Sequence, residues 1–170
     1  MITRRDPAMT AATDGVVVDA EAFVAEAERL TNTYDVAGAA AVYAADASLE
    51  LVTDGAVQWH RGRSAISDAW AIVLGAGQRA GFVVEKELVA ASERTIVNRW
   101  TGSFRHGGRC RGVESWVLDA DGLVVEHRAE TFLDVRPGAS FRGRLAVLLA
   151  SPRVALQLGR VERQVRRRGA

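Results

Sequence analysis

The segment from Gly112 to Ala129 has alternating apolar and polar residues on both sides of an Asp-Gly dipeptide, which is the strongest short-range signal for a β-hairpin. If Ala120 and Asp121 form a two-residue loop, Glu114 pairs with His127 across the two strands. Both side chains then lie on the apolar face of the sheet, with Cβ atoms roughly 5 Å apart. The segment therefore predicts a carboxylate and an imidazole side by side in an apolar site.

The composition is that of a globular protein, with 48% hydrophobic and 25% charged residues in a chain of 170. A single cysteine, Cys110, excludes an intrachain disulfide, and no group of His and Cys has zinc-site spacing. We therefore expect no metal and no organic cofactor. No secretion signal and no run of about 18 apolar residues is found, so we expect a cytoplasmic protein that does not span a membrane.

The net charge of +1 hides an uneven distribution along the chain. From Arg136 onward there are nine arginines and one acidic residue, Glu162, which gives this segment a charge of +8 and the rest of the chain −7. An acidic body with a basic tail is predicted, and the two parts can have different partners.

Helical spacing comes first along the chain and extended segments follow. Asp19, Asp35 and Ser64 are predicted to cap three helices, the third of which ends at Gly75 and Gly77. Helices followed by successive antiparallel strands predict an α+β fold in which the helices cover one face of a curved, antiparallel or mixed sheet. The predicted strands are 46–52, 57–60, 82–90, 95–104, 111–118 and 123–133.

Three regions are expected along the chain. Residues 1–17 are polar and lack a period, which predicts disorder, and residues 18–136 form the α+β domain. Residues 137–170 form a basic extension that begins with Pro137-Gly138 and contains two predicted amphipathic helices, 141–150 and 154–165.

This order of elements resembles the nuclear transport factor 2-like superfamily, and within it the SnoaL-like polyketide cyclases and ketosteroid isomerases. The resemblance covers roughly residues 18–135 and is carried by residues 30–51, the His60 to Ile66 segment and the Glu114 to Val125 hairpin. It implies a cone in which a bent sheet surrounds a long helix and leaves a deep apolar pocket. Many members dimerise through the outer face of the sheet.

The family's catalytic residues carry over only in part. The ketosteroid isomerase base falls at Leu51 and the oxyanion-hole tyrosine at Ala27, so that mechanism is not expected, whereas the protonated carboxyl of the oxyanion hole aligns with Glu114. The Asp-Arg-Asp triad of limonene-epoxide-hydrolase relatives is also missing, because Arg99 precedes Trp100-Thr101 and the final position is Ala129. The SnoaL-like cyclases place an acid/base aspartate on the strand of Glu114.

Glu114 and His127 are the candidate catalytic residues. Burial raises the pKa of a carboxyl and a nearby imidazolium lowers it, so such a pair can hold one proton near neutrality and exchange it with a substrate. Alternatively, the pair is a structural hydrogen bond that fixes the hairpin or a dimer contact. The residues predicted to line the pocket are Tyr34, Tyr43, Trp59, Trp70, Trp100, Trp116 and Ala129.

Arg99 is a further candidate whose direction depends on the turn at Gly107-Gly108. A two-residue loop turns Arg99 into the pocket, whereas a three-residue loop turns it outward. Ile96, Trp100 and Phe104 form the more apolar set of alternate positions, which favours the outward direction.

Two functions from different classes follow. The first is an enzyme that binds a small apolar molecule and transfers a proton on a cyclic, polyketide-like or terpenoid substrate, as a homodimer built through the outer sheet face. The second is a non-catalytic ligand-binding or assembly protein. Packing of the basic tail on protein is favoured over contact with an anionic membrane surface, and no nucleic acid partner is expected, because no aromatic residue follows Phe141.

Overall fold

The computed structural model describes residues 18–133 and, beyond them, residues 145, 149, 151–154, 156–157 and 160. The predictions for residues 1–17 and for most of the tail therefore lie outside the described residues. The chain divides into two compact units, Met1–Asp134 and Val135–Ala170, and the first unit is described by itself here. None of the described helices is long and apolar enough to cross a membrane.

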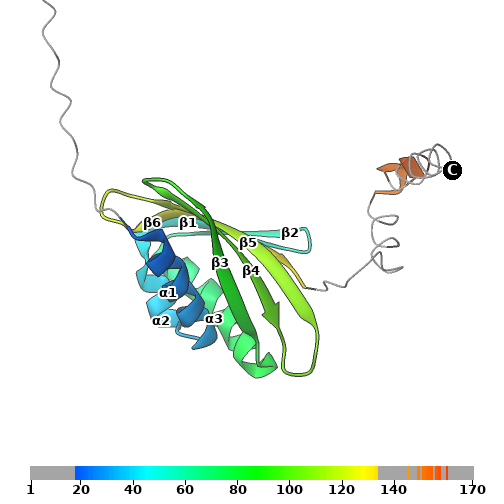
Figure 1. The fold of residues 1–170 in the computed structure, drawn as a ribbon, viewed down its shortest axis with the longest axis horizontal. Helices are drawn as coiled ribbons and strands as arrows, with labels where there is room; N and C mark the ends of the chain where they lie inside the picture. Colours follow the sequence, from blue (N-terminus) through cyan, green and yellow to red (C-terminus); the bar gives the residue numbers. More distant parts are fainter. Residues whose placement is uncertain are drawn as a thin grey trace, which may run out of the picture. The chain divides into compact units, whose positions relative to one another are not determined.

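The first unit is an α+β fold with three helices on one face of a curved sheet (Figure 1). The helices are α1 (Ala20–Asn32), α2 (Val36–Ala41) and α3 (Arg63–Ala80). The strands are β1 (Tyr43–Thr53), β2 (Ala56–Arg61), β3 (Val83–Ala91), β4 (Thr95–Ser103), β5 (Arg109–Leu118) and β6 (Val124–Phe132). Their order in the sheet is β2-β1-β6-β5-β4-β3, and only β1 and β6 are parallel among these strands. The predicted α+β class with a mixed sheet is confirmed.

Two of the three predicted helix caps are confirmed. The Asp19 carboxylate accepts hydrogen bonds from the backbone N–H groups of Glu21 and Ala22, and Asp35 accepts one from Gly38. Ser64 is not the cap of α3, because the N-cap is Gly62 and no side chain bonds to this helix end. The helix also continues past Gly75 and ends at Gly81, which has a left-handed φ of 61°.

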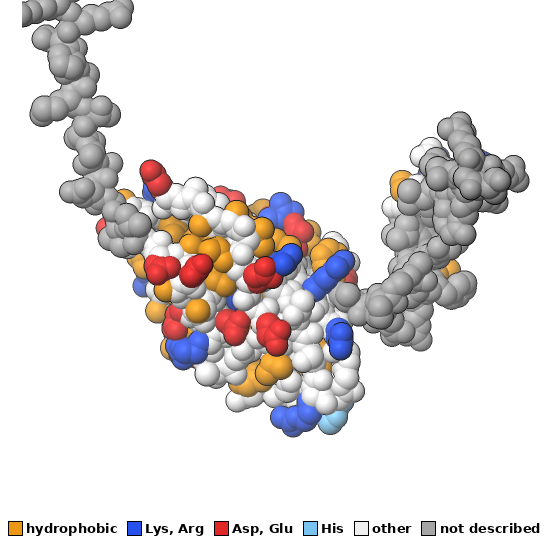
Figure 2. Space-filling model, in the orientation of Figure 1, with side chains coloured by type: hydrophobic (Ala, Val, Ile, Leu, Met, Phe, Trp, Pro, Cys, Tyr) orange, Lys and Arg blue, Asp and Glu red, His pale blue; other side chains and the backbone are white. Residues whose placement is uncertain are grey.

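The main core lies between the helices and the inner face of the sheet. It contains Val24 and Ile66 from α1 and α3, and Leu49, Ile96 and Leu118 from the strands. The sheet curves over the helices (Figure 1), with α1 packed against β3 and the Phe23 ring of α1 against Trp116 of β5. The outer face carries charged residues such as Arg99 and Glu87 beside exposed apolar ones such as Val113. Figure 2 shows the molecule in the orientation of Figure 1, and on this side acidic, basic and hydrophobic side chains are interspersed.

The β5–β6 hairpin forms, but its register differs from the prediction. Trp116 pairs with His127, and Glu114 pairs with Ala129 instead of His127. The Asp119 carboxylate accepts hydrogen bonds from the N–H groups of Asp121 and Leu123 and stabilises a three-residue loop with Gly122 at a φ of 81°. A bulge in the strand pairing adds a second one-residue shift.

These two shifts together preserve the face on which each side chain lies. One shift alone would turn His127 away from Glu114, whereas two shifts restore the same parity. Glu114 and His127 are consequently both inward and buried, but as diagonal neighbours.

Candidate functional site

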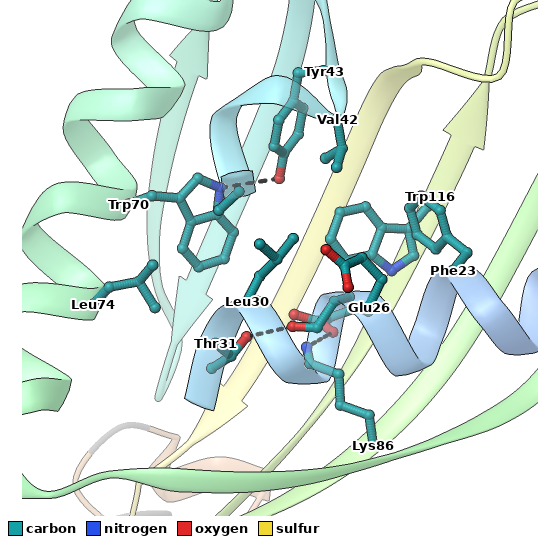
Figure 3. Close-up of a pocket in the computed structure, with 13 residues that line it drawn as sticks. Phe23, Glu26, Leu30, Thr31, Val42, Tyr43, Trp70, Leu74, Lys86 and Trp116 are labelled. Atoms are coloured by element: carbon teal, nitrogen blue, oxygen red, sulfur yellow. Dashed lines mark hydrogen bonds and ion pairs between the residues drawn. The ribbon is translucent and has the colours of Figure 1, made fainter. Parts of the chain in front are cut away.

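A cavity of about 50 Å³ lies between the helices and the inner face of the sheet (Figure 3). Its walls are mainly apolar and aromatic side chains from all three helices and from β1 and β5, and the polar end is formed by Lys86 and Glu114. The lining residues are Phe23, Glu26, Ala27, Leu30, Thr31, Ala39, Val42, Tyr43, Trp70, Leu74, Lys86, Glu114 and Trp116.

Glu114 is held by two neighbouring strands at this polar end. Lys86 from β3 forms an ion pair and hydrogen bond with Glu114 Oε2, and Asn98 from β4 donates a hydrogen bond of 2.8 Å to the same oxygen. Trp116 in turn donates through Nε1 to Asn98 Oδ1 at 2.9 Å. Only 4–5% of the Lys86 and Glu114 side chains is exposed, so the two charges stabilise each other away from bulk water.

The charge state of Glu114 is set by opposing effects. Burial raises the pKa of its carboxyl, but the Lys86 ammonium, with smaller contributions from His127 and Asn98, outweighs burial and holds the pKa below its ordinary value. Glu114 is therefore a carboxylate at neutral pH in the protein without a ligand.

His127 lies behind the cavity wall and is fully buried. Its ring stacks on Trp116 with 3.5 Å between ring centroids and 13° between planes, and its Nδ1 lies 2.6 Å from the Tyr43 hydroxyl. Burial lowers the pKa of His127 to about 3, so the ring is neutral at pH 7. Burial also raises the pKa of Tyr43, which remains a phenol.

The predicted sharing of one proton by Glu114 and His127 does not fit this geometry. Glu114 Oε1 and His127 Nε2 are 3.9 Å apart, which is longer than a hydrogen bond. Burial lowers the pKa of His127, and Lys86 lowers the pKa of Glu114, so both values move away from neutrality and Lys86 supplies the positive charge that was expected from His127. Glu114 and His127 are close, but Lys86 is the direct partner of the carboxylate.

Three of the seven residues predicted to line the pocket do so, namely Tyr43, Trp70 and Trp116. Tyr34 follows the C-cap of α1 with a φ of 56°, and its hydroxyl donates a hydrogen bond to the carbonyl of Phe82. Trp59 lies on the edge strand β2 and is 66% exposed. Neither residue lines the cavity.

Trp100 and Ala129 face inward but do not line the cavity. Trp100 belongs to a second apolar cluster with Val84 and Cys110, and Ala129 is buried opposite Glu114 on β6. The sequence predicted their direction, but not which part of the sheet adjoins the cavity.

Arg99 lies on the outer face of the sheet, in agreement with the favoured alternative. The loop is longer than either turn considered, because β4 ends at Ser103 and β5 begins at Arg109. Arg99 donates two hydrogen bonds of 2.8 Å to the Glu87 carboxylate, so it has no place in the pocket.

Lys86 and Asn98 were not among the predicted site residues, although the alternation of their strands indicates both. Val84, Lys86 and Leu88 occupy alternate positions of one strand, and Ile96, Asn98 and Trp100 occupy alternate positions of the next. A lysine or asparagine within an apolar alternation predicts a polar group on the buried face, where it needs a partner. Within the described part of the chain, no group of three or more His, Cys, Asp or Glu side chains is arranged to hold a metal ion.

The SnoaL-like domain profile matches residues 20–127, which include the helices, the sheet strands β1 to β5 and Glu114. The chain belongs to the SnoaL-like domain family. No curated protein matches the sequence. The identification therefore establishes the family and not an activity.

Solved structures support the same fold for this SnoaL-like protein. A protein of unknown function from Mesorhizobium loti, described as NTF2-like, is 20% identical with a TM-score of 0.55, covering 66% of this chain and 89% of the other. SalBIII, described as an epoxide hydrolase/cyclase-like enzyme in pyran ring formation in salinomycin, is 17% identical with a TM-score of 0.52 over 66% and 89%. A computationally designed 17-OHP binder is 20% identical with a TM-score of 0.50 over 65% and 88%. At these identities the likeness shows the nuclear transport factor 2-like fold alone.

Proposed function

We propose that this SnoaL-like protein binds a small, neutral, largely apolar molecule in the cavity and that Glu114 transfers a proton to or from it. The observation that carries the proposal is the buried ion pair of Lys86 and Glu114, whose two members both line a cavity with mainly apolar and aromatic walls. Buried charges are costly and concentrate at functional sites. SalBIII, with the same fold, is described as an epoxide hydrolase/cyclase-like enzyme in pyran ring formation, which supports a proposal of chemistry that forms or alters a cyclic compound.

The charges of the site favour a neutral ligand with one polar group. Lys86 and Glu114 together have no net charge and Glu26 is paired with Arg29, so the site offers an ionised ligand no net opposite charge to offset the cost of its burial. A ligand carbonyl can accept a hydrogen bond from Lys86 while its acidic C–H or O–H faces Glu114. As the ligand oxygen draws the ammonium toward itself, the pKa of Glu114 rises toward the range suited to proton transfer.

Ligand entry requires the cavity to widen. A dry engineered cavity that binds benzene measures about 150 Å³, whereas this cavity measures about 50 Å³. Side chains of α1 and α2, such as Phe23, Leu30 and Ala39, form the wall opposite the sheet and must move for a ring to enter.

The test is exchange of carbon-bound hydrogen in a panel of cyclic ketones and enones dissolved in D₂O, followed by mass spectrometry. The wild type is expected to accelerate exchange of at least one compound, and Glu114→Gln is expected to reduce the rate by a factor of about 10²–10⁴. Glu87→Gln is the matched control, because Glu87 is exposed on the opposite face of the sheet and pairs with Arg99. Equal rates for a bound compound in wild type and Glu114→Gln would refute the catalytic role.

A second candidate is a non-catalytic protein that binds a ligand or assembles through its outer sheet face. Trp59, Val113 and Phe132 are exposed by 66%, 46% and 46%, and all three side chains lie on that face, which favours a homodimer. If Val113→Glu converts a dimer to a monomer in light scattering, assembly through this face is supported. A wild-type protein that is monomeric at micromolar concentration would reject it.

A further inference from the structure

The Tyr43 hydroxyl connects two residues that are far apart in sequence. Trp70 Nε1 lies 3.1 Å from the Tyr43 oxygen (Figure 3), and His127 Nδ1 lies 2.6 Å from it. An indole N–H can only donate, so the Tyr43 oxygen accepts from Trp70. These three residues come from α3, β1 and β6 and form one continuous hydrogen-bonded chain.

The position of the Tyr43 phenol proton decides which partner donates in the hydrogen bond between Tyr43 and His127 Nδ1. If His127 donated from Nδ1, the phenol proton of Tyr43 would have no acceptor among the described residues, and the unprotonated Nε2 would face the Glu114 carboxylate. If Tyr43 donates to Nδ1, the Tyr43 hydroxyl both accepts from Trp70 and donates to His127, and Nδ1 accepts a hydrogen bond. The proton of the neutral histidine ring is then on Nε2.

We propose that Trp70 and Tyr43 fix His127 in the tautomer with its proton on Nε2, and that His127 thereby acts as a positioning residue for Glu114. This inference rests on the proposed role of Glu114. His127 Nε2 has no hydrogen-bond partner and lies 3.9 Å from Glu114 Oε1. The other oxygen of Glu114 is bound by Lys86 and Asn98.

This arrangement provides a second donor when Lys86 turns to a ligand. A displacement of about 1 Å brings Oε1 within hydrogen-bond distance of Nε2–H. The charged groups near the imidazole are Glu114 and Lys86, and its other neighbours are Tyr43, Trp70 and Trp116. A neutral donor at this position orients the carboxylate without adding another charge.

The tautomer can be measured directly by ¹⁵N nuclear magnetic resonance of the histidine rings at pH 7. The chain has three histidines, so the His127 signals are assigned by comparison with His60→Gln and His106→Gln. The expected spectrum has a protonated Nε2 and an unprotonated Nδ1. Tyr43→Phe is expected to move His127 toward the opposite tautomer and to raise the pKa of the Glu114 carboxyl, measured by ¹³C titration.

Tyr34→Phe is the matched control, because Tyr34 is the other tyrosine of the chain and bonds to the carbonyl of Phe82. A wild-type proton on Nδ1, a charged ring at pH 7, or identical His127 signals in both tyrosine variants would overturn the proposal. If Tyr43→Phe does not fold, the wild-type spectrum and Trp70→Phe, which is expected to weaken the preference, decide the question. No ligand is needed, so a missing exchange activity with the Nε2 tautomer present would reject the proposed function and leave the tautomer assignment intact.

Discussion

Lys86 on β3 reaches across the intervening strand β4 to bind the carboxylate of Glu114 on β5. Asn98, which lies on β4 between them and pairs directly with Glu114, donates to the same carboxylate oxygen. Three adjacent strands thus each contribute one polar side chain to this cluster, of which Lys86 and Glu114 line the cavity and Asn98 is buried behind them.

Removing the cation alone should be costly. In Lys86→Met, Glu114 is left buried without its charge partner, and we expect a loss of about 3–5 kcal/mol in the free energy of unfolding at pH 7, measured with urea. Lys86→Met combined with Glu114→Leu should recover most of this loss. The exposed pair provides the control, because Arg99→Met should cost no more than about 1 kcal/mol. If Lys86→Met lost as little unfolding free energy as Arg99→Met, the buried ion pair would not contribute to the stability of the fold.

His127 should make stability depend on pH below neutrality. The folded protein binds a proton at His127 only near pH 3, whereas the unfolded chain does so near the ordinary value of 6.5, so stability is complete above pH 6.5 and falls as the pH falls toward 3. The expected slope is about 1.4 kcal/mol per pH unit. The lowered pKa of Glu114 acts with the same sign but below its ordinary value of 4.5, so urea denaturation between pH 6 and pH 5 isolates His127.

His127→Phe should remove this slope while keeping a ring against Trp116. His106→Gln, in the exposed loop between β4 and β5, should leave it unchanged. An unchanged slope in His127→Phe would mean that another group takes up the proton.

The sequence predicted the fold well because the fold depends on alternation and caps. Asp19 and Asp35 cap their helices as expected, and the inward direction of Glu114 and His127 follows from side-chain parity. Ser64 failed as a cap because α3 already begins at Arg63, with Gly62 as the N-cap. These are local properties, and local sequence determines them.

The site was less predictable because its contacts join strands that are not adjacent. Alternation places Lys86 and Asn98 on the inner face, but it does not show that Lys86 reaches Glu114 over β4. Likewise, the exact register of His127 depended on the Asp119 loop and on a bulge, each of which changes pairing by one residue. Distances between side chains therefore required the three-dimensional structure.

Filling the cavity should block ligand binding without unfolding the protein. Ala27 lines the cavity from α1, so Ala27→Leu places three more carbon atoms in the space a ligand would use. We expect at least about a tenfold loss of affinity for any cyclic ketone that binds the wild type. The measurement is the tryptophan fluorescence of a Trp59→Phe background, in which Trp70 and Trp116 line the cavity and Trp100 lies outside it. Ala25→Leu, on the exposed side of the same helix, is the control. Equal affinities in the two variants would place the ligand elsewhere.

Gly112 should tolerate no side chain. An added Cβ would lie 2.3 Å from the carbonyl oxygen of Glu130 and 2.4 Å from Trp100 Cε2, and backbone cannot easily move away. We expect Gly112→Ala to cost at least about 1–3 kcal/mol in unfolding free energy, by the same overpacking that destabilises crowded cores. Gly75→Ala is the control, since nothing lies within 4 Å of its added Cβ inside α3, and it should stabilise by roughly 0.5–1 kcal/mol. Thermal or urea denaturation should therefore show changes of opposite sign in the unfolding free energy of the two variants. No change in the stability of Gly112→Ala would show that Trp100 can shift.

The SnoaL-like domain should keep its stability without the basic tail. Both apolar clusters of the described chain are built from residues between Val18 and Val125, and the last strand ends at Phe132. A chain that stops at Gly138 should therefore melt within a few degrees of the full-length protein, because a change of 1 kcal/mol moves the midpoint by about 2–8 °C. The deletion removes eight of the nine arginines that follow Val135, so binding to a cation-exchange resin should weaken strongly. A fall of more than about 10 °C, several kcal/mol by the same scale, would show that the tail contributes to the folded domain, and a change of oligomer size in light scattering would identify the tail as an assembly element.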